Sequence, residues 1–180
     1  MKSLETARLR LVPLAAEDFE PLYAVYSEPE VSRHLLTQPR SRDEFRRPFE
    51  QMLESSSTLG MWMIVDKADN RSIGRCGFYP FSEPPVGTPE LAYLLSRAYW
   101  SRGLATEAAL CCLDFAFRTQ GWPEVVAMVR PENALSARVL SKIGMQLLRR
   151  ITVRGIPADL YQISSASYAP TGRASVGAGR

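Results

Sequence analysis

The chain has 180 residues, of which 46% are hydrophobic and 23% are charged, and its formal net charge is +3. This length suits one domain that buries a sizeable core without support from disulfides or metal ions. So small a charge excess does not argue for nucleic-acid binding. The N-terminus lacks an apolar signal core, and no apolar run approaches the length of a membrane span. We therefore expect a cytoplasmic protein with no nucleic-acid or membrane partner.

Three cysteines, Cys76, Cys111 and Cys112, cannot all pair with one another, and two of them are adjacent within a helical pattern. Structural thiols in a reducing compartment are the simplest explanation. Neither a metal-ligand spacing nor a convincing Cys–His pair is present, so we expect no metal site. His34 is the only histidine, and its unpatterned surroundings give no reason to assign it a role.

The first third of the chain is predicted to form a strand and two helices. Residues 8–13 alternate polar and apolar side chains and end at a proline, which is typical of a strand. Apolar residues at helical spacing predict a helix over residues 17–27, which Pro29 should stop, and a second helix over 42–55. Arginines cluster near the start of the second helix; a solvated face explains them best, while attraction of an acidic partner stays open.

Three strands and a long helix follow. Residues 61–65 and 72–79 are predicted to form a hairpin, because the segment between them is polar and rich in turn formers. After a proline-rich loop, residues 90–95 have the pattern of the next strand. A helix is expected from about Gly103 to Thr119, and Gly121 should end it.

The last third contains a strand, a short helix and two more strands. Residues 125–129 form a continuous apolar run suited to a buried central strand. A helix is expected over about 134–143, then strands over 146–153 and 159–163, separated by a turn at Arg154–Gly155. Together the elements predict an α/β (α+β) fold, in which helices cover both faces of a mixed sheet.

From about residue 164 onward the composition collapses to Ser, Ala, Gly, Pro and Arg, with Tyr168 the only aromatic residue. Such a segment cannot bury enough apolar area to offset the entropy lost on ordering. We therefore expect one folded domain over residues 1–164 and a flexible tail over 165–180.

The stretch from Tyr99 to Ala108 carries the first functional signal. It joins a strand pattern to the long helix, with Arg102 and Gly103 at the turn and small residues after them. The first backbone N–H groups of a helix lack internal partners, and with the helix dipole they attract phosphate. Gly103 would let an anionic ligand approach the backbone, and the dipole alone explains Glu107. An ordinary helix start is the alternative interpretation.

The segment Trp100–Ala105 resembles the acyl-CoA-binding motif Gln/Arg-x-x-Gly-x-Gly/Ala of the GCN5-related N-acetyltransferase (GNAT) family, although Trp100 departs from the first position. A Trp followed by Gly-x-Ala-Thr-Glu-Ala is similar to the branch of ribosomal-protein N-terminal alanine acetyltransferases. Three further segments, Leu4–Leu11, Asn133–Met145 and Asp159–Tyr161, agree with the family in its order. The resemblance implies a mostly antiparallel sheet whose two middle strands splay apart and admit the cofactor.

The resemblance also implies an enzyme that transfers the acetyl group of acetyl-CoA to a primary amine by direct attack, without a metal. The branch favours a protein N-terminal amine as acceptor. A small-molecule amine, such as a metabolite or antibiotic, and a non-catalytic acyl-CoA-binding module remain alternatives, and a homodimer is compatible with all three. A nucleotide phosphotransferase is poorly supported, because the chain has no Gly-x-x-x-x-Gly-Lys-Ser/Thr loop.

The same resemblance indicates where the cofactor binds. The diphosphate is expected on the amides of the turn and first helical residues, supplemented by the Thr106 hydroxyl and the Arg102 charge. Backbone groups of the preceding strand are expected to hold the pantetheine arm and to stabilise the oxyanion. The predicted cofactor-binding residues are Leu94, Leu95, Ser96, Arg102, Gly103, Leu104, Ala105, Thr106 and Asn133.

Two side chains are predicted to carry the chemistry. A protonated amine has no free lone pair, so a nearby carboxylate would assist its deprotonation, and the resemblance places such a carboxylate at Glu90. An exposed strand-start glutamate is the alternative, and Glu132 is a competing acid better suited to a loop or cap. In the family a Ser or Tyr protonates the departing thiolate, for which we favour Ser136 over Tyr161. Asn133 and Ser136 could instead merely cap a helix.

Overall fold

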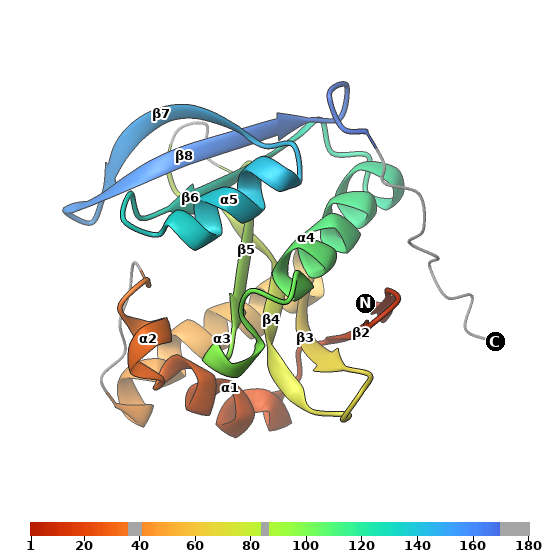
Figure 1. Ribbon diagram of the computed structural model, residues 1–180, viewed down its shortest axis with the longest axis vertical. Coiled ribbons are helices and arrows are strands. Elements are labelled where there is room, and N and C mark those ends of the chain that lie inside the picture. Colours follow the sequence, from red (N-terminus) through yellow and green to blue (C-terminus); the bar gives the residue numbers. More distant parts are fainter. Residues whose placement is uncertain (36–40, 84–86, 170–180) are drawn as a thin grey trace.

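The computed structural model describes residues 1–35, 41–83 and 87–169. Eight strands form one sheet in the order β1-β2-β3-β4-β5-β6-β8-β7, and helices cover both of its faces (Figure 1). The strands are β1 (Leu4–Glu5), β2 (Leu9–Pro13), β3 (Met61–Asp66), β4 (Ser72–Pro80), β5 (Pro89–Leu95), β6 (Glu124–Val129), β7 (Gln146–Val153) and β8 (Ile156–Ser164). The helices are α1 (Phe19–Tyr26), α2 (Pro29–Ser32), α3 (Arg42–Thr58), α4 (Leu104–Asp114) and α5 (Ala134–Lys142). The predicted mixed, mostly antiparallel sheet is confirmed, since only β5 and β6 pair in parallel among the described strands.

Pro29 does not simply stop the first helix, as the sequence analysis expected. Helix α1 already ends at Tyr26, and Pro29 is the first residue of the short helix α2. A proline suits this position because its missing N–H would have no partner inside the helix. The long predicted helix is α-helical to Asp114 and continues as a π-helical turn over Phe115–Thr119. No helix in the described ranges is both long and apolar enough to cross a membrane.

Strand β8 begins at Ile156, earlier than the predicted start at Asp159. Pro157 lies in this early part, and a proline cannot donate to the ladder. In the structure, however, β6 pairs with β8 only from Asp159 onward, whereas β7 pairs with it back to Ile156. The early part of β8 therefore has one open edge, where a proline is tolerated.

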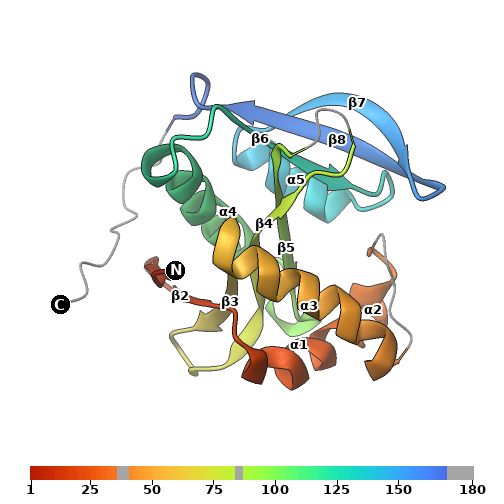
Figure 2. The same ribbon diagram turned by 180° about the vertical axis from the view of Figure 1, so that it is seen from behind.

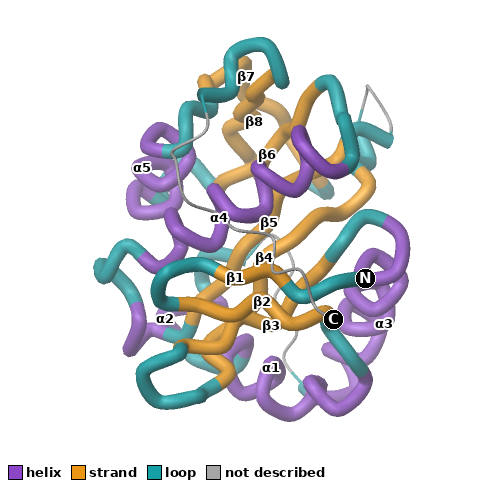
Figure 3. Tube along the Cα trace, turned by 90° about the vertical axis from the view of Figure 1, so that its right-hand side faces the viewer, coloured by secondary structure: helices purple, strands orange, loops and turns teal. Residues whose placement is uncertain are grey.

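Strands β5 and β6 are neighbours only near their beginnings. The one residue pair in register between them is Glu90 with Val126, and beyond it the strands diverge, which gives the splay that the family resemblance implied. The side view shows β6, β7 and β8 gathered above β1 to β4 (Figure 3). The sheet therefore consists of two lobes, β1 to β5 and β6 to β8, joined at the base of the splay.

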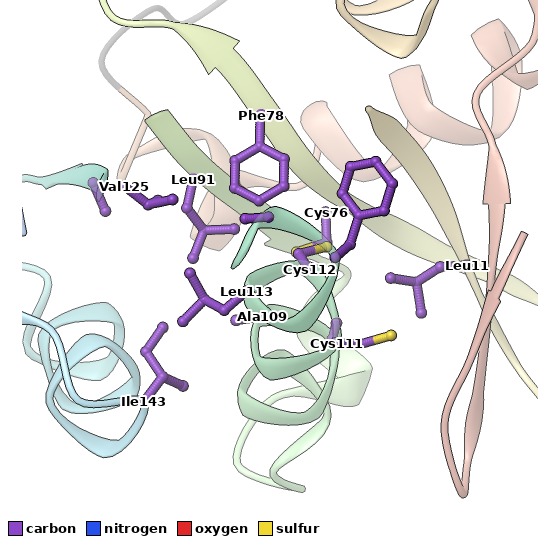
Figure 4. Packing of buried hydrophobic residues seen from close by; sticks show 14 of the residues in the cluster. Leu11, Cys76, Phe78, Leu91, Ala109, Cys111, Cys112, Leu113, Val125 and Ile143 are labelled. Atoms are coloured by element: carbon purple, nitrogen blue, oxygen red, sulfur yellow. The ribbon is translucent and has the colours of Figure 1, made fainter. Parts of the chain in front are cut away.

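The two faces of the larger lobe carry separate hydrophobic clusters. On one face, Cys76 and Leu91 pack against Cys112 of α4 (Figure 4). On the other, Leu94 belongs to the same cluster as Phe45 of α3, and this helix crosses the front of the sheet in the reverse view (Figure 2). Side chains that alternate along β5 therefore reach two different environments.

The folded part of the chain continues past residue 164. The hydroxyl of Tyr168 donates to Asp114 Oδ1 at 3.0 Å, and its ring lies 5.0 Å from the ring of Phe117. Tyr168 therefore packs beside α4, although the composition placed it in the flexible tail. The remainder of that predicted tail, residues 170–180, lies outside the described residues.

Gly74 lets β4 approach β5 closely, with φ +151 and only 2.0 Å between an added Cβ and the carbonyl oxygen of Leu94. We expect Gly74→Ala to lower the free energy of unfolding by more than about 3 kcal/mol, because the backbone must shift and the conformation is strained. Chemical denaturation measures this loss. The control is Gly121→Ala, with φ +66 and nothing within 4 Å of an added Cβ, for which about 1 kcal/mol is expected. Equal losses in the two variants would contradict a close contact at Gly74.

Candidate functional site

A cleft of about 1090 Å³ opens where β5 and β6 separate. Its walls come from these two strands, the N-terminus of α4, helix α5, and helices α1 and α3. Most of the predicted site residues line it, namely Glu90, Leu94, Leu95, Gly103, Leu104, Ala105, Thr106, Asn133 and Ser136. Ser96, Arg102 and Tyr161 are not among the lining residues.

The N-terminus of α4 meets this cleft without a side-chain cap. Gly103 stands at the cap position with φ +77, and no side-chain capping hydrogen bond is recorded there among the described residues. The first internal helical bond runs from Glu107 N to Gly103 O at 3.1 Å, so the amides before Glu107 have no partner within the helix. An uncapped group of donors at the positive end of a helix dipole suits a diphosphate.

Glu107 does more than match the helix dipole, which was the only role expected of it. Its carboxylate accepts hydrogen bonds from Thr6 Oγ1 at 2.5 Å, Arg8 N at 2.9 Å and Arg8 Nε at 2.7 Å. Burial acts to raise the pKa of Glu107, but the bonds from Thr6 and Arg8 outweigh it and leave the pKa below its usual value. Arg8 Nη1 also donates to the carbonyl of Arg102 at 2.9 Å. These bonds fix the turn before α4 against the start of the chain.

The side chain of Arg102, whose charge was expected to supplement the diphosphate site, contacts Asp66 and Tyr99. Its Nη2 lies 3.6 Å from Asp66 Oδ2, and its guanidinium lies 5.2 Å from the ring centroid of Tyr99. The buried carboxylate of Asp66 thus draws the arginine away from the cleft. The contribution of the Arg102 charge therefore stays a prediction that would require this side chain to leave Asp66, whereas its backbone lies in the turn.

The backbone N–H and C=O groups of β5 point alternately toward β4 and toward β6. Only those that point toward β6 face the gap between the two diverging strands. Ser96 N donates to Ile73 O at 2.8 Å, and the Leu94 carbonyl faces β4. Because successive peptide groups of a strand point in opposite directions, the N–H groups of Tyr93 and Leu95 face β6. Of the three predicted backbone donors, Leu95 alone faces the gap. The Ser96 amide is engaged with β4, and the Tyr93 amide, which the sequence analysis did not name, faces the gap.

Ser136 and Asn133 lie in the first turn of α5. Asn133 Oδ1 accepts a bond from Ser136 N at 3.1 Å and so caps the helix, as the alternative interpretation expected. Both residues nevertheless line the cleft. The Ser136 hydroxyl lies 2.8 Å from the hydroxyl of Tyr93, whose pKa is raised by burial. The sequence held no clue to this partner, because a strand tyrosine is ordinarily a packing residue.

Glu90 lines the cleft from the face of β5 that is directed toward α1 and α3, opposite to Tyr93. Burial raises the pKa of its carboxyl to about 7, and the positive charge of Arg75 opposes part of this rise. A group with a pKa near neutrality can exist as a carboxylate and still accept a proton readily. The geometry and the pKa therefore suit the predicted general base.

Arg75 is a second residue of this face that the sequence analysis did not single out. It is only 6% exposed, and its Nε donates to the Tyr26 hydroxyl at 2.8 Å. Its guanidinium lies 5.7 Å and 5.2 Å from the ring centroids of Tyr26 and Tyr79. An arginine inside an otherwise apolar strand was the available clue, since a charge is seldom buried without a specific environment.

Glu132, the acid that competed with Glu90 in the sequence analysis, lies outside the cleft. Glu132 Oε1 pairs with Arg130 Nε at 2.6 Å, and Glu132 is not a lining residue. His34, which was given no role, does line the cleft, with its ring 6.0 Å from the ring of Trp100. Burial and the positive charge of Arg33 lower the pKa of His34, which keeps the imidazole neutral at physiological pH.

The three cysteines are buried free thiols, as their positions indicated. The sulfur atoms of Cys76 and Cys112 lie 3.4 Å apart in the core beneath α4 (Figure 4). Burial raises the pKa of Cys111 to about 12, so none of its reactive thiolate form is expected at neutral pH. Within the described ranges, no group of three or more His, Cys, Asp or Glu residues could hold a metal ion.

A family model described as the acetyltransferase (GNAT) domain matches residues 8–146 of the sequence. The chain belongs to the GNAT family. It is therefore an acyltransferase, and the family resemblance stated from the motifs is confirmed.

Individual proteins agree with this assignment. The chain is 31% identical over 171 residues to the Bacillus licheniformis protein named "Uncharacterized N-acetyltransferase p20", covering 91% of this chain and 96% of that protein. Its fold matches an acetyltransferase from Agrobacterium tumefaciens with a TM-score of 0.78 at 28% identity, covering 91% and 94% of the two chains. It also matches Mycobacterium smegmatis RimJ in complex with CoA-disulfide, with a TM-score of 0.75 at 16% identity, covering 96% and 90%.

The GNAT family uses acetyl-CoA, and the chain's own residues fit this cosubstrate. The uncapped amides at Gly103 to Thr106 provide donors for the diphosphate. The amides of β5 that face the splay provide donors for a peptide-like arm, because they lack a neighbouring strand beyond Glu90. The splay thus leads from the uncapped helix end to the carboxyl of Glu90.

We expect Gly103→Val to weaken CoA binding at least about tenfold, because a β-branched side chain resists positive φ and the amides lose their common direction. Isothermal titration calorimetry with CoA measures the dissociation constant. Gly155→Val is the matched control, since Gly155 has φ +80 at the turn between β7 and β8, with nothing within 4 Å of an added Cβ. Unchanged CoA affinity in a folded Gly103→Val protein would count against the phosphate site.

Proposed function

We propose that this GNAT enzyme transfers the acetyl group of acetyl-CoA directly to a protein N-terminal amine, with Glu90 as general base. One observation carries the proposal: the uncapped end of α4 and the Glu90 carboxyl, with its pKa of about 7, line the same cleft. An anion site alone would suit a binding module. The carboxyl with a raised pKa adds the group that an amine acceptor requires.

In the proposed reaction Glu90 removes a proton from the acceptor ammonium. The free amine attacks the thioester carbonyl, and the amides of Leu95 and Tyr93 stabilise the developing oxyanion. The C–S bond breaks as the new C–N bond is retained, the nitrogen loses its second proton through Glu90 to water, and Ser136 gives a proton to the departing thiolate. Asn133 supports this step by holding the first turn of α5 through its cap bond.

The part of the cleft beyond Glu90 supports a polar acceptor of some length. Helix α3 contributes the side chains of Arg47, Gln51 and Glu54 to its wall. Such a wall offers donors and acceptors to a peptide backbone, and the fold likeness to a Vibrio fischeri structure described as a ribosomal-protein-S5-alanine acetyltransferase is consistent with a protein acceptor.

A small amine that carries an anionic group is the second candidate acceptor. Arg75 is a buried cation that lines the cleft near Glu90, and none of the ion pairs recorded among the described residues includes it. A carboxylate or phosphate on the acceptor would compensate that charge. Arg75 therefore favours this candidate, whereas the polar wall of α3 favours the peptide.

A panel of acceptors separates these candidates. Short peptides with different first residues are compared with small amines that carry or lack a carboxylate, and CoA release and acetylated product are both measured. Turnover of peptides supports the proposal, whereas turnover confined to anionic small amines assigns the second candidate. Tight CoA binding with no turnover of any acceptor would indicate a non-catalytic acyl-CoA-binding module.

We expect Glu90→Gln to lower kcat/KM by about 100-fold near neutral pH. In the parent protein the carboxylate predominates above pH 7, so the rate should fall as the pH drops through that value. The variant should instead follow the ionisation of the free amine, and the two rates should converge as the acceptor deprotonates unaided. Initial rates across about pH 6 to 9 test this, with the CoA dissociation constant as a control that should not change. Identical pH profiles would remove Glu90 from the mechanism.

A further inference from the structure

Tyr93 lies at the centre of the site, and the chemistry above uses only its backbone. Its side chain points from β5 to the face covered by α4 and α5, where it packs against the hydrophobic cluster around α4. Its phenol lines the cleft and reaches the first turn of α5. The hydroxyl is therefore within reach of the one side chain proposed to protonate the thiolate.

The hydroxyl of Tyr93 lies 2.8 Å from Ser136 Oγ and 3.1 Å from the carbonyl oxygen of Ser136. A phenol has one hydrogen, so two arrangements exist. If Tyr93 donates to the carbonyl, Ser136 donates its own proton to Tyr93 and has none to offer the cleft. If Tyr93 donates to Ser136 Oγ, the serine proton is free. The second arrangement uses the shorter of the two contacts.

Tyr93 is the only side chain recorded within hydrogen-bond distance of Ser136 Oγ in the described part of the chain. The serine backbone is fixed independently, because Asn133 caps the helix through Ser136 N. Orientation of the hydroxyl therefore depends on Tyr93. An isolated serine hydroxyl is also a weak acid, and a donor behind it offsets the charge that develops when it gives up its proton.

We propose that Tyr93 is a positioning residue that donates its hydroxyl proton to Ser136 Oγ and thereby directs the serine proton to the sulfur of CoA as it departs. The inference rests on the proposed transfer reaction. When the C–S bond breaks, its electron pair stays on sulfur, which takes the proton of Ser136, and the Tyr93 proton shifts to Ser136 Oγ. The attacking nitrogen loses two protons, one from the ammonium before attack and one after it has bonded to the carbonyl carbon, and Glu90 takes each in turn and passes it to water. Water returns one of these protons to Tyr93 and the other is released to solvent, so one proton leaves for each amide formed.

A double-mutant cycle tests the coupling. Tyr93→Phe removes one oxygen and keeps the packed ring, and Ser136→Ala removes the proposed donor. Each should lower kcat by about 10-fold to 100-fold while KM for acetyl-CoA changes less than about 3-fold. The double variant should be no slower than Ser136→Ala, because the two residues act as one unit. Multiplied losses in the double variant, or parental kcat in either single variant, would overturn the inference.

A selenoester analogue of acetyl-CoA distinguishes proton delivery from a structural role. A selenol is much more acidic than a thiol, so the selenolate leaves without a proton, and the defects of Tyr93→Phe and Ser136→Ala should largely disappear. Defects of equal size with both donors would contradict the role of Tyr93. If Tyr93→Phe does not fold, fluorinated tyrosine at this position keeps the hydrogen bond and lowers the phenol pKa. An unchanged pH dependence of kcat in that protein would equally overturn the inference.

Tyr168→Phe is the matched control. It also removes a tyrosine hydroxyl beside α4, bonded to Asp114 Oδ1 at 3.0 Å, but Tyr168 does not line the cleft. Parental kcat is expected for this control.

Slow hydrolysis of acetyl-CoA, which breaks the same C–S bond with water as acceptor, separates the two proposals. One outcome is that no amine is acetylated, while hydrolysis is slowed in Tyr93→Phe and Ser136→Ala by the factors expected above. This outcome would reject the proposed function and uphold the role of Tyr93. If amines are acetylated and the Tyr93→Phe variant has the parental rate, the proposed function is upheld and the role of Tyr93 is rejected.

Discussion

The site depends on the failure of two parallel strands to stay together. Strand β5 is bonded along its length to β4, and β6 is bonded along its length to β8, so each has a complete antiparallel partner on its outer side. Only Glu90 and Val126 hold the two inner edges in register. The twist of each lobe then carries the edges apart, and the amides that face the gap keep their capacity to donate. A free strand edge normally invites another strand. Here it faces a cleft that suits a peptide-like pantetheine arm.

The two ends of this gap differ in their electrostatics: the α4 end attracts negative charge, whereas burial at Glu90 disfavours it. At the end of α4, oriented backbone dipoles attract an anion without a buried ionic side chain, and Arg8 and Glu107 hold that end in place. At Glu90, burial makes the charged form costly and raises the pKa to about 7, while Arg75 limits that rise. Desolvation without Arg75 would leave a carboxyl protonated at neutral pH, and an exposed carboxyl would be a poor proton acceptor. The neighbouring cation thus keeps the pKa of the Glu90 carboxyl near neutrality.

The sequence predicted the parts of the site that depend on local pattern. Gly103 between a strand and a helix predicted the uncapped helix end, and the start of a strand predicted the place of Glu90. It did not indicate the features that depend on strand register or on residues far apart in the chain. The direction of the Ser96 amide follows from the pairing of β5 with β4, and the pairing of Arg102 with Asp66 joins segments that only the fold brings together. Tyr93 and Arg75 look like packing residues until their partners Ser136 and Tyr26 are known.

The contrast between local pattern and tertiary contact also distinguishes two parts of the cleft. We call the part at the α4 end, where acetyl-CoA is proposed to bind, the donor half, and the part around Glu90, where the amine is proposed to bind, the acceptor half. The donor half consists largely of backbone groups, namely the amides of the α4 end and of β5, so a glycine at one turn and a strand that diverges from its neighbour suffice to build it. The acceptor half consists of side chains from α1, α3, β4 and β5, among them Tyr26, Arg75 and Glu90. These can change without any change in the backbone that carries them. The backbone pattern therefore accounts for the use of acetyl-CoA, which is common to the family, while no backbone pattern fixes the side chains around Glu90, such as Arg75.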